Sequence, residues 1–327
     1  MEKTILNGTA LQVSEIGIGG SHFGGKLDEQ ASFTLLDAYM EKGGNLVDTA
    51  HSYGTASCEE ESPSEKTIGA WIRSRNCREQ ICLMTKGAHP NMIPEKMAFG
   101  PSRVSREAIL HDLHMSLRTL QTDYVDLYFP HRDNEEVPVS EIIDVLEEER
   151  QKGTIRYYGC SNWKPERMEQ ASAYAEEKGY QGFVCSQVPA NLAVFPPFFM
   201  AETGMLCMDE ETKKYHEQTG MPAMPVMALA NGYFQKRLAA HGGQLEGWPA
   251  ILYNGSVNDA IYEKLAQLNQ EGLPINSVLF AYVKNFSFQT VPILGFSSVK
   301  QMDQTLQEIS VSVPEEVLRE LEIIRKA

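Results

Sequence analysis

Short apolar segments alternate along the chain with longer segments that have the periodicity of amphipathic helices. Eight apolar segments are bounded by turn residues and are interpreted as strands: 15–20, 46–50, 81–86, 125–131, 155–161, 182–188, 225–230 and 290–296. Between them, segments such as 105–121 repeat apolar residues at helical spacing. Strands that are apolar throughout are buried on both faces, which is typical of parallel sheets covered by helices. The pattern therefore predicts an α/β fold, a closed (β/α)8 TIM barrel that forms a single domain over residues 1–327.

The two ends of the chain differ from this repeat. Residues 1–14 place Asn7 and Gly8 between two short apolar runs, which predicts a β-hairpin with a type I′ turn that caps the lower mouth of the barrel. Residues 309–327 are assigned to a C-terminal helix, in which Val317, Leu321 and Ile324 fall on one face.

Three connections are too long for simple links between a strand and its helix. They are residues 87–104, 189–208 and 231–255, and each follows a predicted strand. In a barrel of this kind they lie over the carboxyl ends of the strands, where long loops enclose a ligand. Two acidic stretches, 59–61 and 146–153, are interpreted as solvated faces.

The composition limits the kinds of partner. The chain of 327 residues has a net charge of −15, which argues against nucleic acid or an anionic membrane as the main partner. No apolar run reaches the roughly 18 residues of a membrane helix, and the first residues lack the apolar core of a signal peptide. We therefore expect a cytoplasmic protein with a small-molecule ligand, and the oligomeric state stays open.

The cysteines show no metal-binding or disulfide pattern. They are Cys58, Cys77, Cys82, Cys160, Cys185 and Cys207, with no C-x-x-C pair and no histidine at zinc spacing. The expectation is reduced thiols that mostly fill the core, and no metal site.

Four ionisable side chains lie at or just beyond the ends of neighbouring predicted strands. Asp48 ends the second strand and Tyr53 follows it, Lys86 ends the third, and His131 ends the fourth. The carboxyl ends of barrel strands meet at one mouth, so these side chains are expected to converge. A lysine at the rim of an apolar core needs a counter-charge, which Asp48 on the adjacent strand supplies. The four residues therefore form the predicted catalytic group.

Tyr53 is the predicted acid of this group. A cation beside its phenol would lower the pKa from about 10 towards neutrality and make the phenol a usable proton donor. His131 would hydrogen-bond a substrate oxygen and help to relay a proton. Taken singly, each residue also has an ordinary explanation: Asp48 as a turn residue, Lys86 reaching solvent, His131 on the surface and Tyr53 in the core. Their joint occurrence at three consecutive strands favours the catalytic interpretation.

Around these residues the sequence resembles the aldo-keto reductase family. The similar segments are DTAHSYG (48–54), MTKG (84–87), PHRD (130–133), GTIRYYGCSNW (153–163) and CSQVPANL (185–192), and the likeness runs from SEIGIGGSHFGG (14–25) to PILGFSSVKQMDQTL (292–306). The resemblance implies a barrel with a capping hairpin and an NAD(P)-dependent oxidoreductase. It would transfer a hydride between a nicotinamide and an aldehyde, ketone or sugar-type carbonyl or alcohol. Motif by motif, it implies Tyr53 as proton donor, Lys86 and Asp48 as the pair that tunes it, and His131 as the residue that orients the carbonyl.

The resemblance also implies a cofactor site for NADP or NAD. Ser161, Asn162 and Gln187 match strand-end residues that hydrogen-bond the nicotinamide carboxamide. Gly20 and Ser21 match the first loop, which approaches the cofactor by its backbone. The other implied cofactor contacts are Asp48, Gly295, Ser297, Lys300, Gln301 and Gln304.

One departure from the family pattern concerns the phosphate of the cofactor. Ser297 stands where members that prefer NADPH usually carry a basic residue, and Thr305 stands where an asparagine often contacts adenine. Lys300 is either a substitute phosphate ligand or a solvated residue. The choice between NADP and NAD therefore stays open.

A second departure concerns the aromatic residue that commonly stacks on the nicotinamide. Its position matches Val226 or Met227, neither of which is aromatic. Trp163 is one candidate to stack on the nicotinamide in its place. The predicted substrate pocket is lined from the loops after the first, fourth and sixth strands by His22, Phe23, Arg132, Trp163, Phe195, Phe198 and Phe199. This mixture suits a sugar or other polyhydroxylated carbonyl, or a small aromatic aldehyde. Phe198 and Phe199 equally fit a loop anchor.

Two alternatives to a reductase stay open. A lyase or aldolase would use Lys86 as a Schiff-base nucleophile, which leaves Tyr53, Asn162 and Gln187 without a role. A nicotinamide-binding regulatory or redox-sensing subunit would act through a protein partner and would favour a large exposed apolar patch. The sequence determines neither the physiological substrate nor the direction of flux.

Overall fold

A curled parallel sheet forms the centre of the protein. The computed structural model describes residues 1–55, 57, 59–93 and 98–327, and within them the strand order is β10-β9-β8-β5-β4-β3-β11. The strands are β3 (Gly17–Gly19), β4 (Leu46–Asp48), β5 (Cys82–Gly87), β8 (Val125–Pro130), β9 (Ile155–Ser161), β10 (Phe183–Gln187) and β11 (Ile293–Leu294). Each of them falls within or close to a predicted strand, so the prediction is confirmed for all but the segment at 225–230.

The predicted strand at 225–230 is wrong, and an earlier segment, 222–226, takes its place in the barrel. Within it, Ala223 forms isolated parallel bridges to both neighbours, β10 and the chain just before β11. Pro222 and Pro225 lack the N–H groups that a continuous ladder needs. These bridges join the two edges of the sheet, and the fold is the predicted (β/α)8 barrel.

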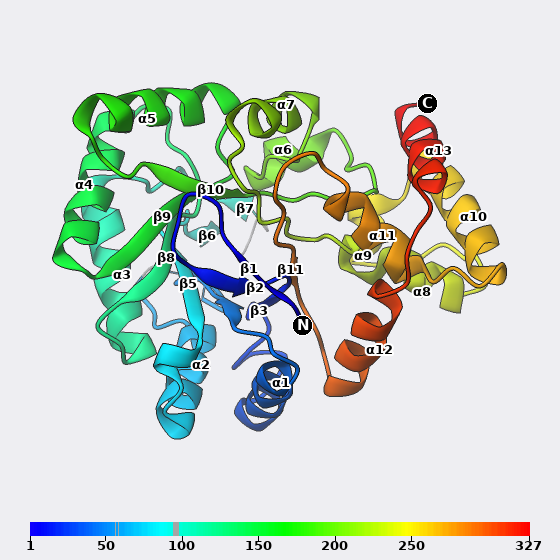
Figure 1. Ribbon diagram of the computed structural model, residues 1–327, viewed down its shortest axis with the longest axis horizontal. Coiled ribbons are helices and arrows are strands. Elements are labelled where there is room, and N and C mark those ends of the chain that lie inside the picture. The colour runs from blue at the N-terminus through cyan, green and yellow to red at the C-terminus, as the bar shows by residue number, and fades with distance from the viewer. Residues whose placement is uncertain (56, 58, 94–97) are drawn as a thin grey trace.

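Helices surround this sheet (Figure 1). The helices that alternate with the barrel strands are α1 (Glu29–Glu41), α2 (Pro63–Arg75), α3 (Arg106–Leu120), α4 (Val139–Lys152), α5 (Pro165–Lys178), α7 (Glu210–Thr219), α11 (Ile275–Lys284) and α12 (Val299–Ile309). Several begin at a side chain that accepts a backbone N–H of the first turn, at Asp28, Ser62, Ser105, Asp209 and Ser298. Helices α10 (Ser256–Gln270) and α13 (Glu315–Lys326) pack against each other outside this layer.

Apolar side chains fill two layers, one inside the barrel and one between the strands and the helices. The inner layer contains Leu46, Met84, Leu127, Phe129, Val184 and Met224, together with Leu6, Leu11 and Val13 of the N-terminal hairpin. The outer layer takes alternate residues of the same strands, among them Val47, Leu83, Tyr128 and Cys160. Neighbouring residues of a strand point to opposite faces, so two buried layers require strands that are apolar throughout.

The N-terminal hairpin is confirmed, but its turn differs from the prediction. Strand β1 (Lys3–Ile5) pairs antiparallel with β2 (Gln12–Ser14). A type I′ turn needs positive φ at both central residues, whereas Gly8 has a φ of +75° and Asn7 is not in that region. The backbone N–H of Thr9 donates to the carbonyl oxygen of Leu6 at 3.0 Å, so residues 6–9 form a turn with positive φ at Gly8 alone, which is the pattern of a type II turn. The Thr9 hydroxyl donates to the same oxygen at 2.7 Å.

The C-terminal helix is shorter than predicted. Helix α12 extends to Ile309, and α13 begins at Glu315, directly after Pro314. Proline is favoured at the start of a helix and disfavoured within one, so the helix predicted from residue 309 begins only at Glu315.

The acidic stretch at 146–153 is not uniformly solvated, which corrects the sequence interpretation. Glu147 and Glu149 of α4 are buried. Glu147 accepts a hydrogen bond from the Tyr158 hydroxyl at 3.1 Å, and Glu149 accepts one from the Thr154 hydroxyl at 2.7 Å. These carboxylates connect α4 to β9 and to Thr154, the residue directly before that strand.

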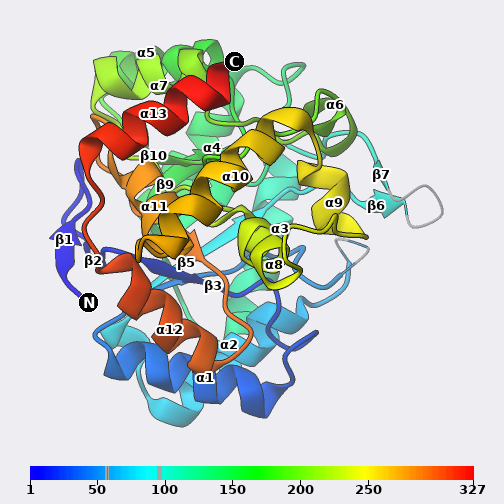
Figure 2. The same cartoon turned by 90° about the vertical axis from the view of Figure 1, so that its right-hand side faces the viewer.

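The long connections lie at the carboxyl end of the strands, as predicted. They contain the short strands β6 (Met92–Ile93) and β7 (Ala98–Phe99), the helices α6 (Phe198–Thr203), α8 (Tyr233–Ala239) and α9 (Trp248–Tyr253), and the 3-10 turn η3 (Ala230–Gly232). A further 3-10 turn, η1 (Arg78–Gln80), precedes β5. Figure 2 shows β6, β7, α6 and α9 at the end of the molecule opposite to the hairpin of β1 and β2. No helix in the described ranges is long and apolar enough to cross a membrane.

The cysteines that the structure describes are free thiols: Cys77, Cys82, Cys160, Cys185 and Cys207. All but Cys207 are buried, and burial raises the pKa of the Cys185 thiol. Cys58 lies outside the described residues. The described cysteines therefore act as core residues or part of the covering layer, without a disulfide among them.

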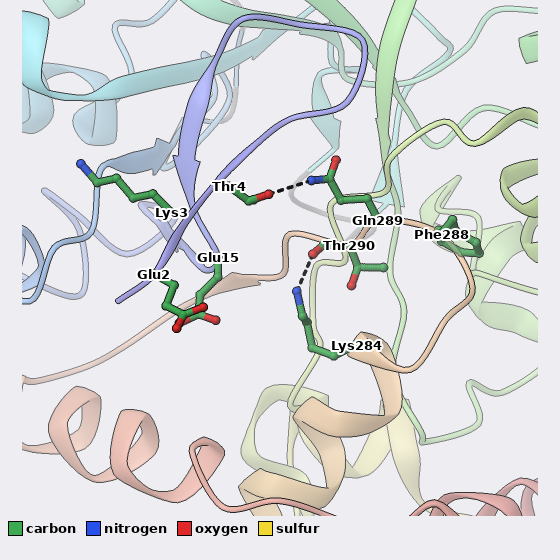
Figure 3. A pocket seen from close by; sticks show the side chains of 8 residues that line it. All are labelled: Glu2, Lys3, Thr4, Glu15, Lys284, Phe288, Gln289 and Thr290. Atoms are coloured by element: carbon green, nitrogen blue, oxygen red, sulfur yellow. Dashed lines mark hydrogen bonds between the residues drawn. The ribbon is translucent and has the colours of Figure 1, made fainter.

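A hollow at the amino end of the barrel lies between the hairpin and the chain before β11 (Figure 3). It is lined by Glu2, Lys3, Thr4, Glu15, Lys284, Phe288, Gln289 and Thr290. Lys284 Nζ donates to the carbonyl oxygen of Thr290 at 2.9 Å, and Gln289 Nε2 donates to Thr4 Oγ1 at 3.3 Å. The Gln289 contact holds the hairpin against the barrel, and the Lys284 contact joins α11 to the chain before β11, at the end away from the predicted catalytic residues.

Candidate active site

The structure brings the four predicted catalytic residues to one mouth of the barrel. Asp48 is the last residue of β4, Lys86 lies in the adjacent strand β5, and His131 directly follows β8. Tyr53 lies in the turn after β4. That turn folds back because the backbone N–H of His51 donates to the carbonyl oxygen of Lys86 at 2.9 Å.

The ammonium group of Lys86 is the centre of this cluster. Its Nζ donates to Asp48 Oδ1 at 2.5 Å, to the carbonyl oxygen of Thr49 at 2.7 Å and to the Tyr53 hydroxyl at 3.0 Å. Lys86 is 0% exposed. Burial lowers the pKa of Lys86, but the Asp48 carboxylate and the Tyr53 phenol outweigh it, and the net shift is upward from 10.5. Lys86 is therefore a buried cation with all three of its N–H donors occupied.

The pKa of Tyr53 is raised from 10.0, which is opposite to the sequence prediction. Burial is the largest cause and the Asp48 carboxylate adds to it, while Lys86 and Arg132 act in the lowering direction. Desolvation of a phenolate outweighs the nearby cations because one of them already shares its charge with Asp48. Tyr53 is therefore a neutral phenol at neutral pH, with its proton in place.

His131 is a neutral imidazole beside this phenol. The two rings meet edge to face with centroids 5.9 Å apart. Burial, followed by the charges of His89, Arg132 and Lys86, lowers the pKa of His131 well below 6.5. Its Nδ1 lies 3.4 Å from the Ser52 hydroxyl. If that hydroxyl donates to Nδ1, the hydrogen lies on Nε2, and His131 acts as a hydrogen-bond donor and not as a charged acid.

Sequence reasoning missed His89, which packs against His131 with ring centroids 4.6 Å apart. Its Nδ1 lies 2.7 Å from the carbonyl oxygen of Pro90, which places a hydrogen on that nitrogen. Burial, with the charge of Arg132, lowers the pKa of His89 to about 3. The sequence signal that could have revealed His89 is a polar side chain three residues after Lys86, just beyond the end of β5. The turn that brings it back depends on Ala88, at a φ of +57°.

The environment of Lys86 gives little support to the Schiff-base alternative. A nucleophilic amine must be neutral, whereas the pKa of Lys86 is raised and its N–H donors are all bonded. In the part of the chain that the structure describes, no three His, Cys, Asp or Glu side chains are placed together to hold a metal ion. The arrangement instead fits proton transfer from a phenol.

The three residues expected to hold a carboxamide lie together at the ends of β9 and β10. Gln187 Nε2 donates to Asp48 Oδ1 at 3.3 Å, which connects these residues to the catalytic cluster. Asn162 has a φ of +59°, and its Nδ2 donates to Ser161 Oγ at 2.9 Å. Its Oδ1 accepts from the backbone N–H of Leu206 at 3.2 Å. The side chains of Ser161, Asn162 and Gln187 therefore lie together, and the loop after α6 is hydrogen-bonded to Asn162.

Gly20 serves packing, while Ser21 is exposed. The backbone N–H of Gly20 donates to the carbonyl oxygen of Asp48 at 2.7 Å, and its own carbonyl oxygen accepts from Ser64 Oγ at 2.8 Å. A Cβ on Gly20 would lie 2.9 Å from that Asp48 oxygen. Both backbone groups of Gly20 are therefore used within the protein, and Ser21 is the residue of this pair that stays open to a ligand.

The predicted phosphate-end residues gather at the start of α12, and all are exposed: Gly295, Ser297, Lys300, Gln301 and Gln304. Gln301 Oε1 accepts from both the N–H and the hydroxyl of Ser297, at 2.7 and 2.8 Å. Thr305 is buried and faces the barrel. Exposed backbone and a cation at a helix start form an environment suited to an anion.

Two residues predicted to line a substrate pocket are instead core residues. Trp163 is buried, donates from Nε1 to the carbonyl oxygen of Arg132 at 3.2 Å and meets the Phe183 ring at 4.9 Å. It is not placed to replace a stacking aromatic residue. Phe23 is also buried, below the first loop. His22 and Arg132 remain at the mouth, with His22 half-buried.

The aromatic residues of the loop after β10 form an anchor. Phe199 is buried and stacks on Phe195 with centroids 4.3 Å apart, while Phe198 is exposed. Tyr253 packs on the other side of Phe195 at 5.4 Å. The Tyr253 hydroxyl lies 3.9 Å from the Met227 sulfur. This cluster confirms the loop-anchor alternative for Phe199.

Comparison with known proteins adds independent information. A sequence model described as "Aldo/keto reductase family" matches residues 15–326. A Bacillus subtilis (strain 168) protein named "Uncharacterized oxidoreductase YrpG" is 28% identical over 324 residues, which cover 98% of this chain and 95% of that protein. An aryl-alcohol dehydrogenase (NADP(+)) of Phanerodontia chrysosporium is 27% identical over 339 residues, covering 95% and 82%. Norsolorinic acid reductase B of Dothistroma septosporum is 26% identical over 328 residues, covering 96% and 78%.

Removal of the buried cation should destabilise the fold through Asp48. In Lys86→Met the Asp48 carboxylate, which is 2% exposed, loses its counter-cation, and we expect a loss of about 3–5 kcal/mol in the free energy of unfolding. The double variant Asp48→Asn/Lys86→Met should recover most of that loss. Urea unfolding followed by circular dichroism measures both, and equal stability of the single and double variants would contradict the coupling.

Proposed function

The chain belongs to the aldo/keto reductase family and is an oxidoreductase, and we propose that it transfers a hydride between a nicotinamide dinucleotide and a small carbonyl or alcohol. Tyr53 is the proposed proton donor. The observation that carries the proposal is the Lys86 ammonium, bonded at once to the Asp48 carboxylate and to the Tyr53 hydroxyl at the barrel mouth. Such a cluster has the parts needed to protonate an oxygen that gains negative charge.

The proposed role of Tyr53 follows from its protonation. A phenol with a raised pKa carries its proton at neutral pH and gives it to a substrate oxygen as that oxygen becomes an alkoxide. The phenolate left behind lies 3.0 Å from Lys86 Nζ, which stabilises it. In the oxidation direction the same pair holds the phenolate that accepts the proton of an alcohol.

His131 and His89 are proposed to position the substrate. Both imidazoles are uncharged because burial lowers their pKa values, so neither competes with Tyr53 as an acid near neutral pH. Ser52 beside Nδ1 of His131 leaves Nε2 as the nitrogen that faces a ligand. A fixed neutral donor polarises a carbonyl group without adding a second titrating group.

The cofactor is proposed to be NADPH or NADH, held between the ends of β9 and β10 and the start of α12. When bound, the reduced nicotinamide supplies the hydride. Gln187 and Ser161 offer polar groups at one end, and Lys300 and Ser297 offer exposed groups at the other. Asn162 can join them when its contact with Leu206 opens. We favour NADPH because Lys300 supplies a cation at the helix start and one relative carries NADP(+) in its name.

The proposed substrates are small aldehydes and ketones, or the matching alcohols. One relative is named an aryl-alcohol dehydrogenase and another a norsolorinic acid reductase, and the first name refers to aromatic alcohols. Exposed apolar side chains lie on the loops at the carboxyl end, among them Met92, Phe99 and Phe198. An apolar rim above a polar floor suits a substrate with an aromatic body and one carbonyl.

Replacement of the phenol oxygen tests the donor directly. Tyr53→Phe should lower kcat for aldehyde reduction by about a hundredfold or more, because the oxygen loses its proton source. The dissociation constant for NADPH should stay within about threefold of wild type, since the ring remains. Steady-state kinetics and fluorescence titration measure the two quantities. Tyr180→Phe, outside the mouth, is the matched control and should keep wild-type turnover, and a Tyr53→Phe enzyme that turns over equally well would exclude Tyr53 as donor.

The expected pH dependence of turnover follows from the directions of the pKa shifts of Tyr53 and His131. Reduction needs Tyr53 protonated, and its raised pKa keeps that form until the pH rises beyond 10.0, so reduction should stay level from about pH 6 to about pH 9. His131, with its lowered pKa, should add no change near 6.5. Oxidation needs the phenolate and should become faster over the same range. A step in kcat/KM for reduction near pH 6.5 that disappears in His131→Gln would contradict the neutral imidazole.

A further inference from the structure

A buried arginine lies beside the catalytic cluster without a carboxylate partner among the described residues. Arg132 directly follows His131 and is 7% exposed. Its Nη1 donates to the carbonyl oxygen of His131 at 2.8 Å. A guanidinium has five N–H donors, so this single bond, the only one that its side chain makes within the described chain, leaves most of them unused.

The neighbouring carboxylates are already committed to other cations. Asp133, the next residue, pairs with Arg167 at 2.8 Å. Asp48 pairs with Lys86 at 2.5 Å. The mouth of the barrel therefore has one positive charge more than its described side chains neutralise, and that charge is on Arg132.

The guanidinium faces the same space as the catalytic side chains. The positive charge of Arg132 acts in the lowering direction on the pKa values of Tyr53, His131 and His89, although burial raises the pKa of Tyr53 overall. On the other side, a Cβ on Gly204 would lie 3.9 Å from Arg132 Nε, so the loop after α6 passes over it. Some side-chain nitrogen and oxygen atoms of the described residues are fully buried and have no hydrogen-bond partner, but the nitrogens of Arg132 do not belong to this group. The donors of Arg132 that make no bond within the described chain are therefore not fully sealed from solvent.

An unpaired cation in this position is costly unless a ligand completes it. Burial removes the water that would solvate the charge, and no carboxylate in the described part of the chain replaces that water. The planar guanidinium matches the two oxygens of a carboxylate, and a bidentate pair of this kind is both strong and directional. A site with one spare guanidinium beside its proton donor is thus complementary to a substrate that carries its own anion.

We propose that Arg132 binds a carboxylate group of the substrate, so that the preferred substrates are aldehydes or ketones that also bear a carboxylate, and the corresponding hydroxy acids. This inference rests on the proposed function, because it assigns the substrate class of the same site. Arg132 is a specificity-determining residue: it holds the carboxylate while Tyr53 and His131 face the carbonyl.

A matched pair of substrates isolates this contact. Para-carboxybenzaldehyde and its methyl ester differ in charge and have a similar body. For the wild type, kcat/KM should favour the acid over the ester by about 30-fold or more, and Arg132→Met should lower that ratio to about one. Arg132→Lys, which keeps a charge without the planar fork, should retain part of the preference. Arg319→Met on α13, where the side chain is 69% exposed, is the control and should keep the wild-type ratio.

Several outcomes would overturn the inference. One is the same acid-to-ester ratio in the wild type and Arg132→Met. Another is weaker NADPH binding in Arg132→Met with an unchanged ratio, which would assign the guanidinium to the cofactor. A third is a larger preference for glyceraldehyde phosphate over glyceraldehyde than for the carboxylate pair, which would make the anion a phosphate.

The two proposals fail in different ways. Turnover of the uncharged ester by the wild type depends on the proposed function alone, and its absence with both NADPH and NADH would count against that function. Binding of benzoate, followed by tryptophan fluorescence with and without NADP(+), needs no turnover. Arg132→Met should weaken it by about 30-fold or more. Equal benzoate affinity in the two proteins would overturn the role of Arg132 whatever the turnover.

Discussion

The buried ammonium of Lys86 is the interaction on which the site depends. A charge with no exposed surface is tolerated only when its donors are satisfied, and the protein meets this with Asp48, the Thr49 carbonyl and the Tyr53 hydroxyl. Pairing of β4 with β5 places the carboxylate and the amine side by side. The hydroxyl of Tyr53 is thereby fixed at the mouth, with its proton retained. Because the two nearby imidazoles are uncharged, Arg132 is the unbalanced charge among the described side chains there.

Most of the fold could be predicted from the sequence, because apolar runs at regular intervals can only be buried in a sheet covered on both faces. The errors lie where one residue changes the backbone. Pro222 and Pro225 reduce a strand to isolated bridges, and Pro314 sets the start of the last helix later than the predicted residue 309. The hairpin was predictable, but the type of its turn depends on the φ of Asn7, which is not positive and which the Asn-Gly pair alone does not determine.

The membership of the catalytic cluster could be predicted, but its electrostatics could not. Strand ends locate Asp48 and Lys86 in a barrel, whereas the direction of the Tyr53 shift depends on how much water burial removes, which no spacing reveals. His89 was missed because a left-handed turn brings it back to the mouth. Trp163 was predicted to line the pocket as an aromatic residue just beyond a strand, yet its ring is buried in the core. The direction of a side chain beyond a strand end depends on tertiary packing, which the spacing of residues in the sequence does not determine.

Hydride transfer governed by this cluster is tested most directly with a labelled cofactor. Purified protein is incubated with NADPH carrying deuterium at the transferable nicotinamide position and with a para-substituted benzaldehyde, and the alcohol is analysed by mass spectrometry. The expected result is one deuterium on the carbinol carbon for each NADPH oxidised. Absence of label in the alcohol, with NADPH and with NADH deuterated on either face, would contradict a nicotinamide-dependent reductase.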